Sequence, residues 1–298
     1  RTAGIFQAEG AAMTSLIQDV QPENEEHLSA IYALFRPGPI SAGMPEHYGL
    51  RKNGKEAVDY GIYTDDAEEA KWLDKQLGKA YGIMAFQEDM MLLSTIMAGF
   101  TAGQRSPLRR AIGKKDIKLL GPLKETFFNQ LGEEFRDDNG VLYSPKFKAR
   151  TGELVWEMFE GAAAYAFNKS HSMAYAYLGY YTAFLKANWP GAYGAAILAN
   201  TTESDRRVEA LLALPAEGIE VLSPDVNLSD VHSKPEGLDK VRIGLAEVGG
   251  VSSAGEAIVK YREDSGQFRT ITDLVLRVRV DDSGKRLPSN VLVGLIES

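Results

Sequence analysis

The chain has 298 residues, and its 41 acidic and 33 basic side chains give a formal net charge of -8. With 44% hydrophobic and 25% charged residues, the composition is that of a globular protein and excludes collagen-like, disordered and coiled-coil chains. The absence of cysteine excludes disulfide bonds, thiolate zinc sites and a cysteine nucleophile. Residues 1–10 lack the apolar core of a signal peptide, so we expect a cytoplasmic location. Because the first residue is Arg1 rather than Met, we expect a piece of a longer protein.

Helical periodicity between residues 25 and 214 predicts a mainly α fold. The predicted helices cover residues 26–34, 66–77, 87–98, 153–166, 172–186 and 204–214, and one more begins at Ser106. We expect Arg36-Pro37-Gly38-Pro39 to stop the first helix, and the glycines and prolines of residues 40–65 indicate a loop. The methionines of residues 87–98 are typical of an adaptable core.

The most apolar segment, residues 173–199, has the composition of a membrane span without its continuity. Lys186 lies inside this segment and Pro190-Gly191 interrupts it, so neither half approaches the ~20 apolar residues that a transmembrane helix needs. We therefore expect a buried helix, a break and a second helix, with no membrane contact.

Beyond residue 214 the pattern changes. Alternation at residues 219–222 predicts a short strand that ends at Pro224. The polar residues 228–240 indicate a linker, and glycine turns separate short helices, two of them predicted at residues 271–277 and 289–297. This arrangement is typical of a small helical module, which we expect to be cut short at its end.

Motifs for metal or nucleotide chemistry are scarce. No G-x-x-x-x-G-K-[ST] loop and no H-E-x-x-H sequence occurs, and the four histidines are scattered. Three pairs of adjacent aspartates lie in polar, turn-like contexts, where acids are ordinarily part of a solvated surface. We therefore assign no metal ligand to this chain.

A basic cluster at residues 105–118 carries six basic side chains and one acid, a local net charge of +5. Ser106 and Pro107 predict a helix start, which places the cluster on a helix with Arg110 and Lys114 on one face. Clustered arginine and lysine suit phosphate oxygens, whereas charge alone favours a plain solvated face. Gly113 counts against the plain face, because glycine in a helix costs ~1 kcal/mol relative to alanine.

A second polar segment, residues 165–172, lies between two apolar predicted helices. Asn168 or Ser170 as an N-cap explains one residue of this segment but leaves Lys169 and His171 without a reason. A helix N-terminus with cationic side chains is a natural anion site. If both segments hold one anion, their side chains should face a common cleft. A purely structural role predicts instead that Asn168 caps its helix and that Lys169 points to solvent.

The two segments, residues 108–115 and 167–171, resemble signature segments of the alpha subunits of bacterial DNA polymerase III, the C-family replicative polymerases. Further short motifs agree in the same order over nearly the whole chain, which makes the resemblance far more specific than any one of them. They lie at residues 4–7, 36–39, 51–54, 81–83, 87–88, 180–187 and 224–227. Residues 113–115 and 167–171 resemble the replicative branch more than the error-prone one.

The resemblance implies that residues 1–20 end the palm, that residues 21–227 form the fingers, and that residues 228–298 are a linker and a truncated helix-hairpin-helix module that grips duplex DNA. It implies a DNA-directed DNA polymerase with Mg²⁺ held by palm aspartates that precede Arg1. We therefore expect no catalytic residue in this chain, which alone should be inactive. The implied partners are DNA primer-template, dNTP, a sliding clamp and other replisome subunits.

The implied nucleotide-binding residues fall in the two segments already described. Arg109, Arg110 and Lys114 are expected to hold the triphosphate. Asn168, Lys169 and His171 are expected to meet the nucleotide or to help the fingers close. Lys115 and Ser170 are second choices.

Some positions depart from the family pattern. Gly10 stands where serine is usual, Ser106-Pro107 replaces Ala-Asp, and residues 249–252 lack the Gly-Val-Gly hairpin, which puts DNA-backbone binding by that module in doubt. A divergent homologue, from a phage or an unusual lineage, would account for these changes. The alternatives are a non-catalytic nucleic-acid-binding or scaffold protein on the same fold, and an unrelated helical enzyme that acts on a phosphorylated metabolite.

Overall fold

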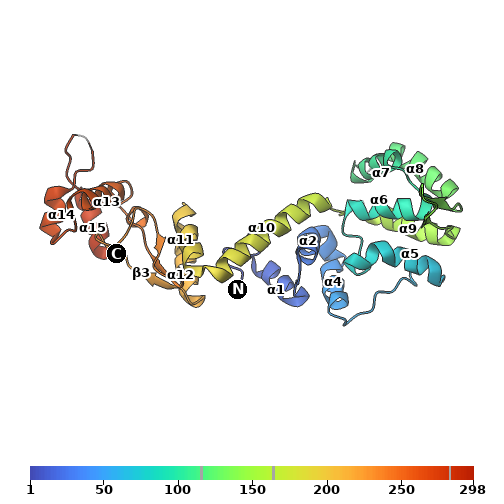
Figure 1. The fold of residues 1–298 in the computed structure, drawn as a ribbon, viewed down its shortest axis with the longest axis horizontal. Helices are drawn as coiled ribbons and strands as arrows, with labels where there is room; N and C mark the ends of the chain where they lie inside the picture. Colours follow the sequence, from blue (N-terminus) through green and yellow to red (C-terminus); the bar gives the residue numbers. More distant parts are fainter. Residues whose placement is uncertain (115–116, 163–164, 282) are drawn as a thin grey trace. The chain divides into compact units, whose positions relative to one another are not determined.

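Helices account for most of the residues that the computed structural model describes, which are residues 1–114, 117–162, 165–281 and 283–298 (Figure 1). The chain divides into two compact units, Gly10–Gly179 and a second one made of Arg1–Glu9 with Tyr180–Ser298. The division falls inside one long helix, α10 (Lys169–Asn188). The mainly α fold predicted from the periodicity is confirmed.

The unit Gly10–Gly179 begins with helices that pack around the buried α2. Their bounds are α1 (Ala11–Val20), α2 (Glu25–Leu34), α3 (Pro37–Ser41) and α4 (Met44–Lys52). Asn24 caps α2 by accepting the backbone N–H of His27 at 2.9 Å. Ile31 and Leu34 on this helix are each 1% exposed, so α2 is a core element.

The prediction of a loop over residues 40–65 is wrong at its start, because α3 and α4 extend to Lys52. Gly43 adopts a left-handed conformation with φ of 67° before α4, and Pro45 lies in the first turn. Tyr48 is 1% exposed and Gly49 packs against Val20 of α1. This helix is stabilised by burial against another element, which a short Gly- and Pro-rich sequence does not reveal.

A second core in the same unit is built from helices and one small hairpin. Their bounds are α5 (Ala67–Leu77), the 3₁₀ helix η1 (Gly78–Ala80), α6 (Gln87–Ala98), α7 (Ala102–Lys114), α8 (Ile117–Gln130), β1 (Phe135–Arg136), β2 (Leu142–Ser144) and α9 (Ala149–Ala162). Phe127 lies at the centre, with its ring 5.1 Å from Trp156 and 6.0 Å from Phe159 between centroids. Met90 and Met97 are almost fully buried here, which confirms their predicted core role.

The apolar segment 173–199 forms two helices with a break, as predicted, but the expectation that the first helix is buried is wrong. Its buried residues are Ser172, Ala176 and Gly179, whereas large apolar side chains such as Tyr181 and Leu185 are exposed. An apolar composition does not tell whether another element covers the helix. Helix α10 (Lys169–Asn188) is followed by α11 (Pro190–Asn200), which starts at the proline, and then by α12 (Ser204–Ala216). Among the described residues, no helix combines the length and the apolar composition that crossing a bilayer requires.

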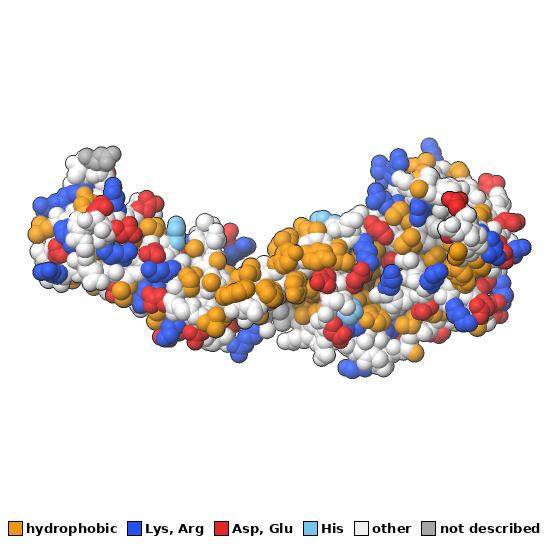
Figure 2. All heavy atoms as spheres, viewed as in Figure 1, with side chains coloured by type: hydrophobic (Ala, Val, Ile, Leu, Met, Phe, Trp, Pro, Cys, Tyr) orange, Lys and Arg blue, Asp and Glu red, His pale blue; other side chains and the backbone are white. Residues whose placement is uncertain are grey.

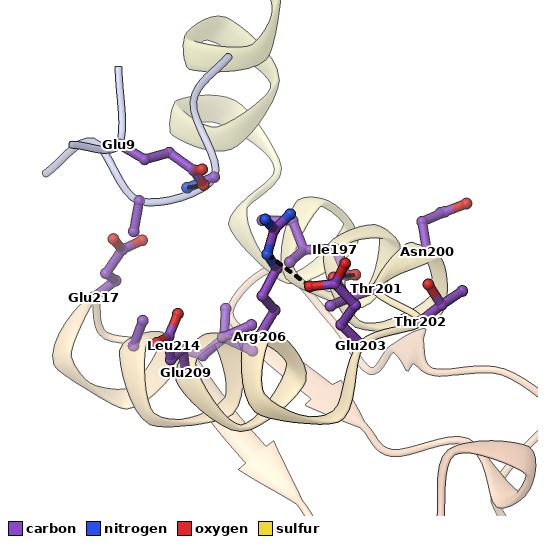
Figure 3. Close-up of a pocket in the computed structure, with 14 residues that line it drawn as sticks. Glu9, Ile197, Asn200, Thr201, Thr202, Glu203, Arg206, Glu209, Leu214 and Glu217 are labelled. Atoms are coloured by element: carbon purple, nitrogen blue, oxygen red, sulfur yellow. Dashed lines mark hydrogen bonds and ion pairs between the residues drawn. The ribbon is translucent and has the colours of Figure 1, made fainter. Parts of the chain in front are cut away.

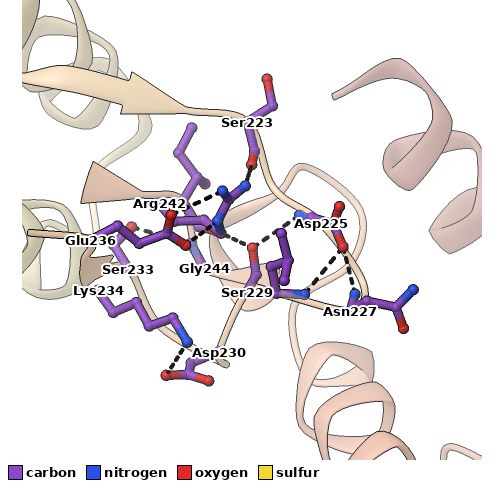
Figure 4. A network of polar contacts seen from close by, with 12 residues as sticks. Ser223, Asp225, Asn227, Ser229, Asp230, Ser233, Lys234, Glu236, Arg242 and Gly244 are labelled. Carbon is purple, nitrogen blue, oxygen red and sulfur yellow. Dashed lines mark hydrogen bonds and ion pairs between the residues drawn. The ribbon is translucent and has the colours of Figure 1, made fainter. Parts of the chain in front are cut away.

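A three-stranded sheet follows α12 in the second unit. Its strands are β3 (Glu220–Leu222), β4 (Lys234–Pro235) and β5 (Lys240–Arg242), in the order β3-β5-β4, with β5 parallel to β3 and antiparallel to β4. Arg242 of β5 donates to the carbonyl of Ser223 at 2.9 Å and pairs with Glu236 (Figure 4). Asp225 accepts the N–H of Asn227 at 2.7 Å, which fixes the turn after β3 (Figure 4).

The last part of the chain is a small helical module. Its elements are the 3₁₀ helix η2 (Leu245–Glu247), α13 (Ala254–Ser265), α14 (Ile271–Arg277) and α15 (Ser289–Glu297). Ile258 and Val278 are fully buried in its core. The Asn227 side chain donates to the carbonyl of Phe268 at 2.9 Å and accepts its N–H at 2.7 Å, so the turn after β3 is fastened to this module.

Candidate functional site

Helix α7 carries the basic cluster, but it does not start where the sequence predicted. The helix begins at Ala102, and Pro107 lies inside it rather than at its first position. The Gln104 side chain accepts the N–H of Thr101 at 2.9 Å, and the N–H groups of Gln104 and Arg105 donate to the Thr101 carbonyl. This is half of a capping box, and the sequence Thr-x-x-Gln was the signal for it. The prediction of a start at Ser106-Pro107 is therefore wrong.

One face of α7 is apolar and the other is cationic. Leu108, Ala111 and Ile112 are at most 1% exposed and attach the helix to the core around Phe127. On the opposite side, Arg109, Arg110 and Lys114 are exposed and Arg105 is half-buried. Figure 2 shows lysine and arginine side chains gathered over α7.

The α7 cations have no acidic partner among the described residues. No carboxylate oxygen of these residues lies within 4.0 Å of the charged groups of Arg105, Arg109, Arg110 or Lys114. Lys115 and Asp116 lie outside the described residues. Like charges on neighbouring turns of a helix repel each other, so this face is electrostatically suited to an external polyanion.

The cost of Gly113 in a helix counts against the interpretation of the α7 cations as a merely solvated face, so the surroundings of Gly113 matter. It is exposed, and the nearest atom to a Cβ at this position is Nε2 of Gln87 at 3.8 Å, an ordinary contact distance. The described protein atoms therefore do not require glycine here.

The second predicted segment forms the start of α10. Asn168 is the N-cap, since its Oδ1 accepts the N–H of His171 at 2.9 Å. The ammonium of Lys169 lies 2.8 Å from a carboxylate oxygen of Glu26 on α2, and 5.4 Å from the ring centre of Phe86. The Lys169 ammonium is therefore paired with α2 rather than extended into open solvent.

Ser170 and His171 are exposed at the first turn of α10. The imidazole of His171 packs against Tyr175, with ring centroids 4.3 Å apart, and meets Phe167 edge-on at 5.5 Å. The ring is held in place by aromatic neighbours while its edge stays accessible to a ligand.

The two segments meet the same element, the start of α6. The N–H of Gln87 donates to the Phe167 carbonyl at 2.8 Å, and the N–H of Phe167 donates to the Ala85 carbonyl at 3.0 Å. The Glu88 carboxylate accepts the N–H of Lys169 at 2.9 Å and the side-chain amide of Asn168 at 3.3 Å. Residues that are ~80 positions apart in sequence are thus joined by a short stretch of paired backbone.

A surface cavity of about 400 Å³ lies between the facing sides of α6 and α7. It is lined by Glu88, Met91 and Leu92 of α6, and by Ala102, Arg105, Ser106 and Arg109 of α7. Glu88 thus borders the arginine-lined cavity and also contacts the start of α10. Glu88 and Glu26 do not stand out as site residues in the sequence, because their partners are distant in sequence.

Burial changes the charge state of the residue next to Glu88. Asp89 is 7% exposed, and burial raises its pKa to about 6, although its Oδ2 accepts the N–H of Phe86 at 3.0 Å. Desolvation disfavours the ionised carboxyl more than this hydrogen bond favours it. At pH 6 Asp89 therefore carries less negative charge than an exposed aspartate would.

The other unit contains a larger cavity, of about 690 Å³, that the sequence did not predict (Figure 3). Four glutamates line it, namely Glu9, Glu203, Glu209 and Glu217. Arg206 also lines it but pairs with Glu203 at 3.0 Å. The acidic excess makes this cavity a poor site for phosphate. In the part of the chain that the structure describes, no three acidic or histidine side chains converge in a way that could hold a metal ion.

Comparison with known proteins shows the family to which the chain is related. Residues 1–134, which include α7, match the family model of the bacterial DNA polymerase III alpha subunit finger domain, and residues 218–297 match a helix-hairpin-helix motif. DNA polymerase III subunit alpha of Aquifex aeolicus is 33% identical over 100% of this chain and 24% of that protein. The Escherichia coli K12 protein is 32% identical over 100% of the chain and 24% of its own length. The Saccharopolyspora erythraea protein is 34% identical over 97% of this chain and 23% of its own length.

This chain therefore spans about a quarter of the length of the curated relatives that it matches. Two family models match separate parts of it, and the relatives align over essentially all of it. The chain belongs to the family of bacterial DNA polymerase III alpha subunits, and it carries the finger region and a helix-hairpin-helix motif of that family.

Proposed function

We propose that the full-length protein is a DNA-directed DNA polymerase that replicates DNA, and that this chain supplies the region that binds the incoming dNTP and the primer-template. The full enzyme joins a deoxynucleotide to the primer 3′ end and releases pyrophosphate. The relatives named DNA polymerase III subunit alpha support the class of reaction.

One observation carries the assignment of nucleotide binding to this chain. The α7 face offers several cations that no described carboxylate neutralises, and it borders a cavity beside the start of α10. Guanidinium groups bind phosphate oxygens through paired hydrogen bonds, and such contacts strengthen as charge develops on the transferring phosphate. Arg109, Arg110 and Lys114 are therefore assigned to the triphosphate, with Lys115 as a further contact.

The start of α10 is assigned a supporting role. Asn168 and Ser170 shape the first turn, and His171 presents an imidazole edge toward the nucleotide. Lys169 reaches phosphate only if it exchanges its ion pair with Glu26 for one with the ligand. The domain limits proposed from the sequence are unchanged: palm to residue 20, fingers over residues 21–227, and the duplex-binding module after residue 227.

The described residues do not fit a catalytic metal site, so no step is assigned to a metal ion in this chain. We place the Mg²⁺-binding palm carboxylates outside residues 1–298. DNA, the dNTP, a sliding clamp and other replisome subunits are the proposed partners of the full-length protein. The role of this chain is to bind and to orient the substrate.

The test is Arg110→Ala in the full-length protein. Loss of a charge-assisted contact to the triphosphate should lower kcat/KM for every dNTP by about tenfold to a hundredfold. Arg150→Ala is the matched control, because Arg150 is an exposed arginine of α9 that pairs only with Glu153 in the structure. Unchanged kinetics for Arg110→Ala would refute the assignment. A full-length protein that bound primer-template without extending it would instead favour the non-catalytic binding or scaffold alternative.

A further inference from the structure

The Glu88 carboxylate lies between the start of α10 and the arginine-lined cavity. Its Oε2 accepts the backbone N–H of Lys169 at 2.9 Å, and its Oε1 accepts the amide of Asn168 at 3.3 Å. The same residue lines the 400 Å³ cavity together with Arg105 and Arg109. One negative charge is therefore present both at a helix start and at the edge of a cationic cavity.

The positive features at the start of α10 already have carboxylate partners. A helix N-terminus attracts anions through its free N–H groups and its dipole, and here Glu88 accepts the first of those N–H groups. The Lys169 ammonium is paired with Glu26 at 2.8 Å. The N–H of His171, in the same turn, donates to the side-chain oxygen of Asn168. An anion in the cavity therefore meets unpaired cations on α7, whereas the Lys169 N–H, the Lys169 ammonium and the His171 N–H at the start of α10 already have partners.

We propose that Glu88 is a built-in competitor for phosphate that positions the nucleotide. By accepting the Lys169 N–H and the Asn168 amide, it confines the phosphate groups to the α7 side of the cavity, and its charge lowers the affinity of the cavity for polyphosphate. This inference rests on the proposed function, because it takes the triphosphate of the incoming nucleotide as the ligand. A lower affinity for polyphosphate also shortens the residence of the pyrophosphate that each nucleotide addition releases, which favours repeated turnover.

Removing the negative charge of Glu88 and removing its hydrogen bond to the Lys169 N–H have different consequences for triphosphate binding. Glu88→Gln has the shape of the native side chain and keeps an oxygen that accepts the Lys169 N–H, but it has no charge. If Glu88 were only an anchor, this variant would bind triphosphate as the wild type does or more weakly. If Glu88 competes with phosphate, the variant binds triphosphate more tightly. The sign of the change therefore separates the two roles.

The experiment is calorimetric titration of the full-length protein with inorganic triphosphate and with a dNTP, in the absence of DNA. For one unit charge at the edge of the cavity, Kd for Glu88→Gln should fall about threefold to tenfold at low salt. The gain should shrink as the salt concentration rises. Glu68→Gln is the matched control, since Glu68 is exposed on α5, pairs with Lys71 and does not line the cavity. Its Kd should equal that of the wild type.

Arg109→Ala separates failure of this inference from failure of the proposed function. If Arg109→Ala weakens triphosphate binding and Glu88→Gln does not tighten it, Glu88 is only an anchor and the inference is overturned, while the proposed function stands. If Arg109→Ala binds as the wild type does, the triphosphate does not contact α7 and both proposals fall. Glu88→Ala is the second charge-removing variant, used where Glu88→Gln does not fold. It must also bind triphosphate more tightly, and equal or weaker binding overturns the inference.

Discussion

Tyr32 of α2 and Gly179 of α10 fit together so closely that the tyrosine hydroxyl occupies the place that a Cβ atom on residue 179 would need. Tyr32 is 8% exposed, so its ring has little room to move. Alanine in a helix interior ordinarily stabilises by ~1 kcal/mol relative to glycine. Overpacking costs ~1–3 kcal/mol, so Gly179→Ala should lower the free energy of unfolding despite the better helix propensity.

Urea unfolding followed by tryptophan fluorescence measures this change. Trp189→Phe as a background leaves Trp72 and Trp156, which both report on residues Gly10–Gly179. Gly161→Ala on α9 is the control, because no described atom outside its own helix backbone lies within 4 Å of its Cβ position, and it should stabilise slightly. Adding Tyr32→Phe to Gly179→Ala should restore part of the loss. Additive effects of the two substitutions would show that the hydroxyl is not the obstacle.

The second prediction concerns the buried carboxylate of Glu69 on α5 and its contribution to the free energy of unfolding. It is 5% exposed and accepts three hydrogen bonds: from the hydroxyl of Thr64 at 2.5 Å, the hydroxyl of Thr151 at 2.6 Å and the N–H of Lys148 at 2.5 Å. Glu69→Ala leaves the buried hydroxyls of Thr64 and Thr151 and the part-buried N–H of Lys148 without this acceptor, at ~1–3 kcal/mol for each buried donor that finds no substitute. We expect a loss of at least ~3 kcal/mol in the same unfolding assay.

Two further variants test the reason for that loss. Glu69→Gln retains one acceptor oxygen and should lose less stability than Glu69→Ala. Glu68→Gln is the neighbouring control, since it removes an equal charge from an exposed pair with Lys71 and should change stability by less than ~0.5 kcal/mol. Equal losses for Glu69→Ala and Glu68→Gln would mean that the buried carboxylate contributes nothing specific.

The sequence predicted those helices best whose signals are local. The predicted residues 87–98, 271–277 and 289–297 coincide with α6, α14 and α15. Asp66, at the predicted start of residues 66–77, is the N-cap of α5 and accepts the N–H groups of Glu68 and Glu69. Helix α4 was missed, since its stability comes from the burial of Tyr48, a contact between elements that no local pattern records.

The candidate site shows the same division. The basic residues of α7 and the polar segment at the start of α10 stand out by composition alone. Composition does not reveal which of these groups are already paired. The Lys169 ammonium forms an ion pair with Glu26, 143 residues away in sequence, and the Lys169 N–H donates to Glu88, 81 residues away. Which cations are vacant and which are paired is decided by long-range packing, and the roles assigned to these residues stay predictions.

The last prediction concerns pH and depends on Asp89. Burial raises its pKa from 3.8 to about 6 in the folded protein, so between these two pH values the folded chain holds a proton that the unfolded chain has released. Stability must therefore fall as the pH rises from about 4 to about 6 and level off above that. The contribution of this group can reach ~3 kcal/mol, because one pKa unit corresponds to ~1.4 kcal/mol.

Asp89→Asn should remove this slope, since asparagine still offers an oxygen to the Phe86 N–H and does not ionise. The free energy of unfolding of the variant minus that of the wild type should increase between pH 4 and pH 7, measured by urea unfolding in the Trp189→Phe background. Asp66→Asn provides a comparison of opposite sign. Hydrogen bonds from the N–H groups of Glu68 and Glu69 lower the pKa of Asp66, so its contribution is present above about pH 4 and is lost as the pH falls. Parallel pH profiles for Asp89→Asn and the wild type would mean that Asp89 is ionised throughout, and that its burial does not control its charge.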